Sequence, residues 1–168
     1  MIRRKAHIFF ASLGASVVCP SCALLTKAEP LSPRYFTADV VPGSGPAVAR
    51  SILKLRLGAV TSATHLDERI AYRVGAVELG FYADRRWTEP PEVYLRRALE
   101  QELFDDQALQ RVVVGWAPTL EVELVAFEEL IGDPPRARIA LSYSLRDEGL
   151  WLLQDTQELV AEVPSARD

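Results

Sequence analysis

The chain has 168 residues, of which 49% are hydrophobic and 25% are charged. This composition fits one globular domain with a buried core and excludes an intrinsically disordered chain. The formal net charge of −4 at pH 7 argues against nucleic acid as a partner, because phosphate binding requires clustered Lys and Arg.

The first residues predict a targeting signal. Arg3, Arg4 and Lys5 form a basic stretch, and residues 6–18 follow as an apolar run. This run is shorter than the roughly 20 residues that a bilayer-spanning helix needs. A lipoprotein signal, a plain secretory signal and an uncleaved anchor are the three interpretations of the pattern.

We favour a lipoprotein signal that is cleaved before Cys22, whose thiol then carries the lipid anchor. Ser21 is small, which suits the residue before a cleaved bond, whereas Cys19 and Pro20 depart from the usual Leu-Ala-Gly-Cys pattern. Loss of the signal removes three basic residues and takes the formal net charge from −4 to −7. The expected segments are a signal peptide over residues 1–21, a lipidated tether over 22–33 and a single domain over 34–168.

Two strands are predicted in the first part of this domain. Residues 34–37 begin the fold, and residues 52–60 alternate apolar and polar side chains, which is the period of a half-buried strand. In the second strand the side chains expected to face the core are Leu53, Leu55, Leu57 and Ala59.

A β-hairpin is predicted over residues 69–74 and 77–83, with its turn at residues 75–76. Its first strand is expected to place Ile70, Tyr72 and Val74 on one half-buried face. The Thr-Glu-Pro-Pro corner at residues 88–91 then starts a helix, since the fixed φ of proline suits a first helical turn. The helix over residues 92–104 has one apolar side, formed by Leu95, Ala98, Leu99, Glu102 and Leu103.

Further strands are predicted after the helix. The run of valines within residues 111–116 indicates a short strand that is buried on both faces. Residues 119–130, 137–145 and 150–156 follow as consecutive antiparallel strands. Three acidic side chains of the first of these are expected to point outward at least in part: Glu121, Glu123 and Glu128.

These elements predict an α/β or α+β fold, with a mixed, largely antiparallel sheet of about five to seven strands around one principal helix. The last residues, 157–168, are too short for a full helix and are expected to form one loose turn. A sheet face is then left exposed, and either a partner covers it or this copy is truncated.

The sequence offers no constellation for catalysis. Both cysteines, Cys19 and Cys22, precede the domain, and His65 is the one histidine beyond the signal. A single His without Cys or a second His does not build an ordinary zinc site, and no Gly-x-Ser-x-Gly elbow occurs. The adjacent carboxylates at residues 105–106 and 128–129 are typical of a solvated face. We therefore predict no enzyme activity, no catalytic residues, no metal and no cofactor.

An ordered set of residues resembles one known family. The set consists of Tyr72-Arg73, Tyr82-Ala83 and Trp87, followed closely by Glu89-Pro90 and a helix. This order is similar to that of the ABC-type transport auxiliary lipoproteins, of which the paraquat-inducible protein C kind is best known. The resemblance extends from about Cys22 to about Gln154. It implies a three-layer fold of the anticodon-binding-domain type, here without the family's last helix.

The resemblance also implies a function and partners. It implies an accessory subunit, lipid-anchored at the periplasmic side of the outer membrane of a Gram-negative envelope, that aids lipid transport between the two membranes. The implied partner is the MCE-domain subunit of an ABC transporter, and a homo-oligomer is an additional expectation. Two alternatives stay open: an envelope lipoprotein with a scaffold role, and a domain that itself carries a lipid.

Arg85, Arg86 and Trp87 form the candidate partner-binding site. They precede the proline corner, and Arg and Trp are the residue types that dominate binding hot spots. A basic pair in an acidic domain suits a partner that bears carboxylates. The alternative is that Trp87 is part of the core, because Trp is highly buried on average.

Overall fold

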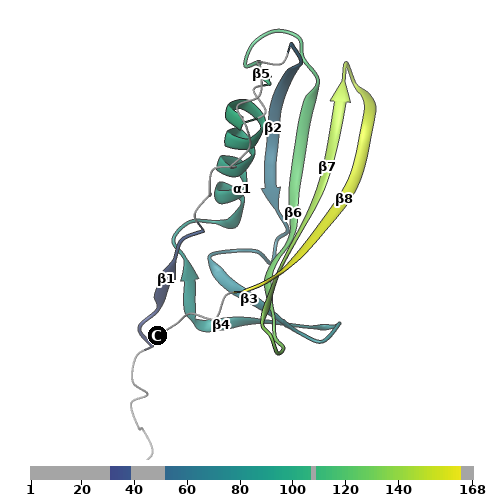
Figure 1. Ribbon diagram of the computed structural model, residues 1–168. Helices are drawn as coiled ribbons and strands as arrows, with labels where there is room; N and C mark the ends of the chain where they lie inside the picture. The colour runs from purple at the N-terminus through teal and green to yellow at the C-terminus, as the bar shows by residue number, and fades with distance from the viewer. Residues whose placement is uncertain (1–30, 39–51, 107–108, 164–168) are drawn as a thin grey trace, which may run out of the picture. The chain divides into compact units, whose positions relative to one another are not determined.

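A computed structural model describes residues 31–38, 52–106 and 109–163. Its elements in chain order are β1 (Arg34–Phe36), β2 (Lys54–Ser62), β3 (Arg69–Val74), β4 (Glu78–Trp87), α1 (Pro91–Glu100), a π-helical turn (Gln101–Asp106), β5 (Gln110–Arg111), β6 (Thr119–Leu130), β7 (Arg136–Asp147) and β8 (Leu150–Glu162). The predicted class is confirmed, because a mixed, open sheet packs with one α-helix (Figure 1). The sheet has eight strands, which is more than expected.

β6 organises the sheet, because strands pair along both of its edges. One edge pairs antiparallel with β7, and β7 pairs antiparallel with β8. The other edge pairs in parallel first with β2 and then with β3. The hairpin of β3 and β4 is therefore attached beside the second half of β6, and β1 adds a short parallel strand to β4.

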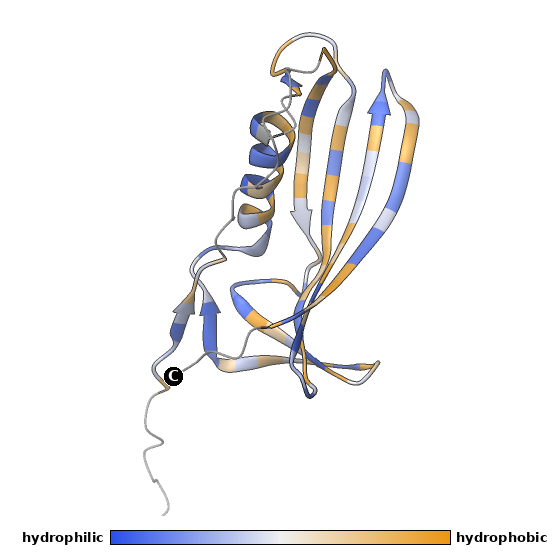
Figure 2. Ribbon diagram, in the orientation of Figure 1, coloured by the Kyte–Doolittle hydropathy of each residue, from blue (hydrophilic) through white to orange (hydrophobic). Residues whose placement is uncertain are grey.

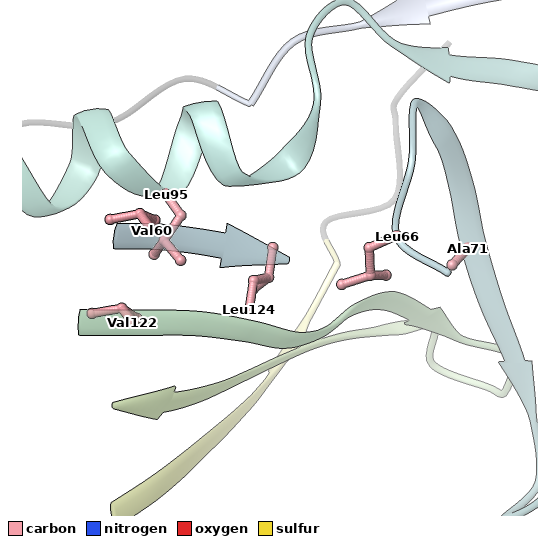
Figure 3. Close-up of a cluster of buried hydrophobic side chains, with 6 residues drawn as sticks. All are labelled: Val60, Leu66, Ala71, Leu95, Val122 and Leu124. Atoms are coloured by element: carbon pink, nitrogen blue, oxygen red, sulfur yellow. The ribbon is translucent and has the colours of Figure 1, made fainter. Parts of the chain in front are cut away.

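The core lies between α1 and the sheet face formed by β2 and β6. Its buried members come from β2, β3, α1, β6 and the loop before β3 (Figure 3): Val60, Leu66, Ala71, Leu95, Val122 and Leu124. Leu99 packs against this cluster, whereas Arg97 on the opposite side of α1 is exposed. The predicted helix faces are thus confirmed for these two residues. Glu102, in contrast, is exposed and was assigned to the apolar side wrongly.

The start of α1 is stabilised by Tyr94, which the sequence pattern did not single out. Pro91 occupies the first helical turn and is almost fully buried. The hydroxyl of Tyr94 lies 2.7 Å from Thr88 Oγ1 and accepts a hydrogen bond of 3.2 Å from the Glu89 backbone N–H. The residue before the helix, Pro90, provides no side-chain cap. The buried hydroxyl of Tyr94 holds the corner instead.

Two predicted faces are wrong: in β2 because a β-bulge changes the alternation of the strand, and in β3 because the core lies on the side opposite to the one expected. A register shift between Leu57 and Val60 turns Val60 into the core and leaves Ala59 exposed. A bulge adds one residue to one strand, so every later side chain changes face. In the β3–β4 pair, the shift between Arg69 and Ala71 places the extra residues on β4, because two steps along β3 oppose five along β4. β3 therefore keeps its alternation, and its buried residue is Ala71, on the side opposite to Ile70 and Tyr72.

The predicted valine strand is also wrong. Only Gln110–Arg111 pair as β5, and Val114 is 90% exposed. β5 and β6 pair with opposite edges of β2. The segment between them must therefore pass over the end of β2, as Figure 1 shows, and it cannot continue as a strand.

The end of the chain forms a strand where a loose turn was expected. β8 continues to Glu162 and pairs with β7 at every residue except Leu152. Residues 164–168 lie outside the described part of the chain. Among the described residues, no helix combines the length and the hydropathy that a membrane span requires.

Candidate functional site

The end of β4 presents the three predicted binding residues on two different faces. Successive side chains of a strand point to opposite sides, so Arg85 and Trp87 share one side and Arg86 takes the other. Arg85 and Trp87 line the same groove. Arg86 lines a separate hollow together with Asp67 and Arg69. The structure thus brings two of the three residues together and separates the third.

Trp87 is half-buried at the wall of this groove. Its indole stacks on the Phe127 ring, with 4.9 Å between centroids and 23° between planes. The Tyr94 ring meets it edge-on at 6.0 Å. Trp87 therefore belongs partly to the core, and its remaining surface faces the groove.

The groove, called here the apolar groove, has a volume of about 610 Å³, within the range of about 300–1,000 Å³ that is typical of ligand pockets. It lies between the end of β4 and the Phe127–Glu129 part of β6, with β7 and β8 as its far wall. Its apolar lining comes from six strands and two flanking residues: Phe36, Ile70, Trp87, Phe127, Pro135, Ala137, Ile139, Leu159, Ala161 and Val163. α1 packs on β2 and β6, so this part of the face stays open.

Arg85 lies at the groove with unused hydrogen-bonding capacity. Its Nη1 is 3.6 Å from Glu129 Oε2, which is an ion-pair distance, and its guanidinium stacks on the Tyr82 ring at 3.9 Å. Within the described residues, Nε of Arg85 is buried and makes no hydrogen bond. The side chain is still 34% exposed, so a carboxylate at the groove could pair with it.

Glu129 is held in place by Tyr82. The Tyr82 hydroxyl donates a hydrogen bond of 2.8 Å to Glu129 Oε2. Burial, together with this bond and the negative charge of Glu129, raises the pKa of Tyr82 to about 12. Tyr82 therefore remains a hydrogen-bond donor to Glu129 throughout the ordinary pH range. Because Glu129 shares its Oε2 between Tyr82 and the more distant Arg85, it neutralises the charge of Arg85 only in part.

Glu128 was expected to point outward at least in part and is instead 4% exposed. Arg73 Nε donates to Glu128 Oε1 at 2.6 Å, and Arg138 Nη1 donates to the same oxygen at 2.8 Å. Burial alone would raise the pKa of Glu128, but these hydrogen bonds outweigh it and lower the pKa. The adjacent carboxylates of residues 128 and 129 thus have different partners: Arg73 and Arg138 for the first, Tyr82 and Arg85 for the second.

Arg86 has a structural role in this corner. Its Nη1 donates to the backbone carbonyl oxygens of Tyr82 and Arg85, at 2.8 and 2.9 Å. The guanidinium therefore fixes the end of β4 from the side opposite the apolar groove. Cys22, the predicted lipid-anchor residue, lies outside the described residues. Within the described ranges, no group of three or more His, Cys, Asp or Glu side chains is placed to hold a metal.

Comparisons with known proteins agree with this fold. Protein XCC0632 from Xanthomonas campestris, assigned to the family DUF330, has a TM-score of 0.66 at 20% identity, over 80% of this chain and 81% of that one. A second crystal structure, described as an uncharacterized protein, has a TM-score of 0.61 at 15% identity, over 82% and 83%. At such identities the likeness establishes the fold alone.

Sequence comparisons establish the family. No curated protein matches the chain. A family model described as the ABC-type transport auxiliary lipoprotein component matches residues 37–168, which include all but the first strand of the described fold. The chain therefore belongs to the family of ABC-type transport auxiliary lipoprotein components.

Proposed function

We propose that this protein is a membrane-anchored accessory lipoprotein of an MCE-type ABC transport system and aids lipid transport between the inner and outer membranes. The observation that carries the proposal is the family match over residues 37–168. The domain would be tethered through Cys22 at the periplasmic side of the outer membrane. Its partner would be the MCE-domain subunit of the transporter.

The apolar groove is the contact site that we assign to this partner. An apolar side chain of the partner would enter between Trp87 and Leu159, which line opposite walls. A carboxylate beside it would pair with the exposed part of the Arg85 guanidinium, which is 3.6 Å from Glu129 and 34% exposed. Interfaces concentrate binding energy in such Trp and Arg anchors, surrounded by groups that exclude water. The domain would then hold the end of a lipid-conducting partner at the membrane and perform no bond chemistry.

The contact site is tested by substituting Arg85 and Arg86 one at a time, because only Arg85 lines the apolar groove. Arg85→Glu is expected to weaken binding of the MCE subunit about tenfold or more, since it reverses the charge at the groove, while the melting temperature stays within about 2 °C. Leu159→Glu, on the opposite wall, is expected to have the same effect. Arg111→Glu, an exposed substitution outside the groove, serves as the control. Unchanged binding of both groove variants in a pull-down would place the partner site elsewhere.

Arg86 provides an internal comparison for this experiment. Arg86→Ala is expected to lower the melting temperature, because two backbone carbonyl oxygens lose their donor. Any loss of binding in this variant should therefore follow the loss of folded protein. A variant with normal stability and no binding would instead make Arg86 a direct contact.

The anchor is tested by Cys22→Ala. Two or three acyl chains hold a protein on a membrane far more firmly than one, since each buried CH₂ contributes about 0.8 kcal/mol. The variant is therefore expected to leave the outer-membrane fraction and to accumulate as soluble or unprocessed protein. Density-gradient fractionation measures this, and a variant that still sediments with the outer membrane would contradict the lipid anchor.

The volume of the apolar groove favours a second candidate function, a domain that itself carries a lipid. Pockets of this size commonly hold small ligands. A carrier should extract a fluorescent phospholipid from vesicles at a fixed ratio to protein, and Leu159→Glu should abolish the extraction. A contact surface alone predicts no extraction by either protein, so the two functions are distinguishable.

A further inference from the structure

β8 is an edge strand with an open side. It pairs with β7 at every residue except Leu152, and no described strand pairs with its other edge (Figure 1). It is 13 residues long, and every one of its residues is exposed. Globular proteins usually shorten or cover such edges, because a long open edge is a template for pairing with another chain.

The sequence of β8 is nearly symmetric in character about Thr156. Leucines stand at the beginning, Leu159 and Val160 stand near the end, and polar residues lie between them, which Figure 2 shows as orange, blue and orange along the strand. The acidic residues Asp155 and Glu158 lie in the polar part. This arrangement suits a second copy of the same strand running in the opposite direction.

We propose that two copies of this chain associate by antiparallel pairing of their β8 strands about a two-fold axis at Thr156. Such an axis, perpendicular to the sheet, keeps each side chain on its own face, so residues equally far before and after Thr156 are opposite each other. Leu153 then faces Leu159, Gln154 faces Glu158, and Asp155 faces Gln157. No two like charges are opposite each other, and the two leucine pairs cover the same face as the core.

The neighbouring registers are less favourable. Centring the pair on Asp155 or on Glu158 places two identical carboxylates opposite each other, which is destabilising. Centring it on Gln157 places Asp155 against Leu159. Charge and hydropathy therefore select the register centred on Thr156. This argument does not depend on the proposed transport function.

The structure also limits the length and the charge of this ladder. The shift between Leu145 and Arg146 leaves Leu152 without a partner on β7, so the regular ladder begins at Leu153. Pairing from Leu153 to Leu159 is longer than the usual strand of about 5–6 residues. Glu158 is already paired with Arg138, at 2.8 Å, in its own chain. Gln157 donates to Asp155 at 3.2 Å, and the same amide could donate to Asp155 of the second copy.

Disulfide trapping tests the two-fold axis directly. In the full chain carrying Cys19→Ser and Cys22→Ser, Thr156→Cys would place two thiols directly opposite each other. The Cβ atoms of opposite residues are about 4.5–5.5 Å apart, close to the spacing of about 3.5–4.5 Å in a disulfide. We expect rapid oxidation to a covalent dimer. Gln154→Cys and Glu158→Cys should not cross-link alone but should cross-link when mixed. Equal cross-linking of all single variants, or none from Thr156→Cys, would overturn the proposal.

Charge substitution at Gln157 gives an independent measurement. In Gln157→Glu, the new carboxylate of each copy lies opposite Asp155 of the other copy. The dimer then contains two like-charge pairs, and its dissociation constant should rise about tenfold. Gln157→Lys should lower it by a similar factor. Val77→Glu, at the exposed tip of the other hairpin, is the control. Sedimentation of the full chain in detergent measures the constants. A monomeric wild type, or equal constants for the two Gln157 variants, would contradict the pairing.

Discussion

Replacing Leu124 with alanine is expected to lower the free energy of unfolding by about 3–5 kcal/mol. Leu124 is 1% exposed and lies at the centre of the cluster between α1 and the sheet. Figure 3 shows it between Val60 and Leu66, with Leu95 of the helix above. Truncation removes the transfer free energy of three carbon atoms and leaves a cavity that a helix packed on a sheet cannot close.

Val125 is the matched control for this substitution. It follows Leu124 on the same strand, but it is 38% exposed. Val125→Ala is expected to change the free energy of unfolding by under about 1 kcal/mol. Urea titration of both variants measures the difference. Similar losses for the two would show that the core is not centred on this face of β6.

The strands with the clearest alternation were predicted well from the sequence. β6 has the predicted bounds, and β7 extends the predicted range by one residue before Ala137 and two after Leu145. The turn at Gly75 is also confirmed, and its φ of +62° is one that glycine adopts without strain. These features depend on neighbours close in sequence, which is why the pattern of residues was sufficient.

Features that depend on distant partners were not predictable in the same way. The bulge of β2 arises where it meets β6, and the extra residues of β4 lie where it meets β3; no local signal marks either. The burial of Glu128 likewise depends on Arg73, which is 55 residues away. The valine segment was misassigned because its course is set by which edges of β2 its neighbours occupy.

The candidate site was predictable only in part. Arg85, Arg86 and Trp87 were predicted as one site; β4 continues through them to Trp87, and the period of two in the strand separates Arg86 from the other two. The apolar groove was not predictable, because its far wall comes from Ile139 and Leu159. An exposed sheet face had been expected from the missing last helix, and the structure gives part of that face a defined concave surface. That the contact belongs to a transport partner stays a prediction.

Glu128→Gln is expected to lower the free energy of unfolding by about 3 kcal/mol at pH 7. The carboxylate is buried and accepts hydrogen bonds from Arg73 and Arg138. The amide introduced by this substitution has nearly the same shape as the carboxylate, but it carries no charge. Its NH₂ group cannot accept the hydrogen bonds that the two arginines donate. The two arginines would lose a partner in a poorly hydrated place, and this loss is larger than the net value of the ion pair itself.

The pH dependence distinguishes this charge from simple packing. The pKa of Glu128 is lowered from its ordinary value of 4.5, so the folded protein binds this proton less well than the unfolded chain does. The stabilisation is therefore complete above about pH 4.5 and is lost as the pH falls through the folded-state pKa. Wild type and Glu128→Gln should differ most at neutral pH and converge in acid. Glu123→Gln, an exposed change on the same strand, should differ little from wild type at neutral pH. A gap for Glu128→Gln that stays constant from pH 7 to pH 3 in urea titrations would assign its effect to shape and not to charge.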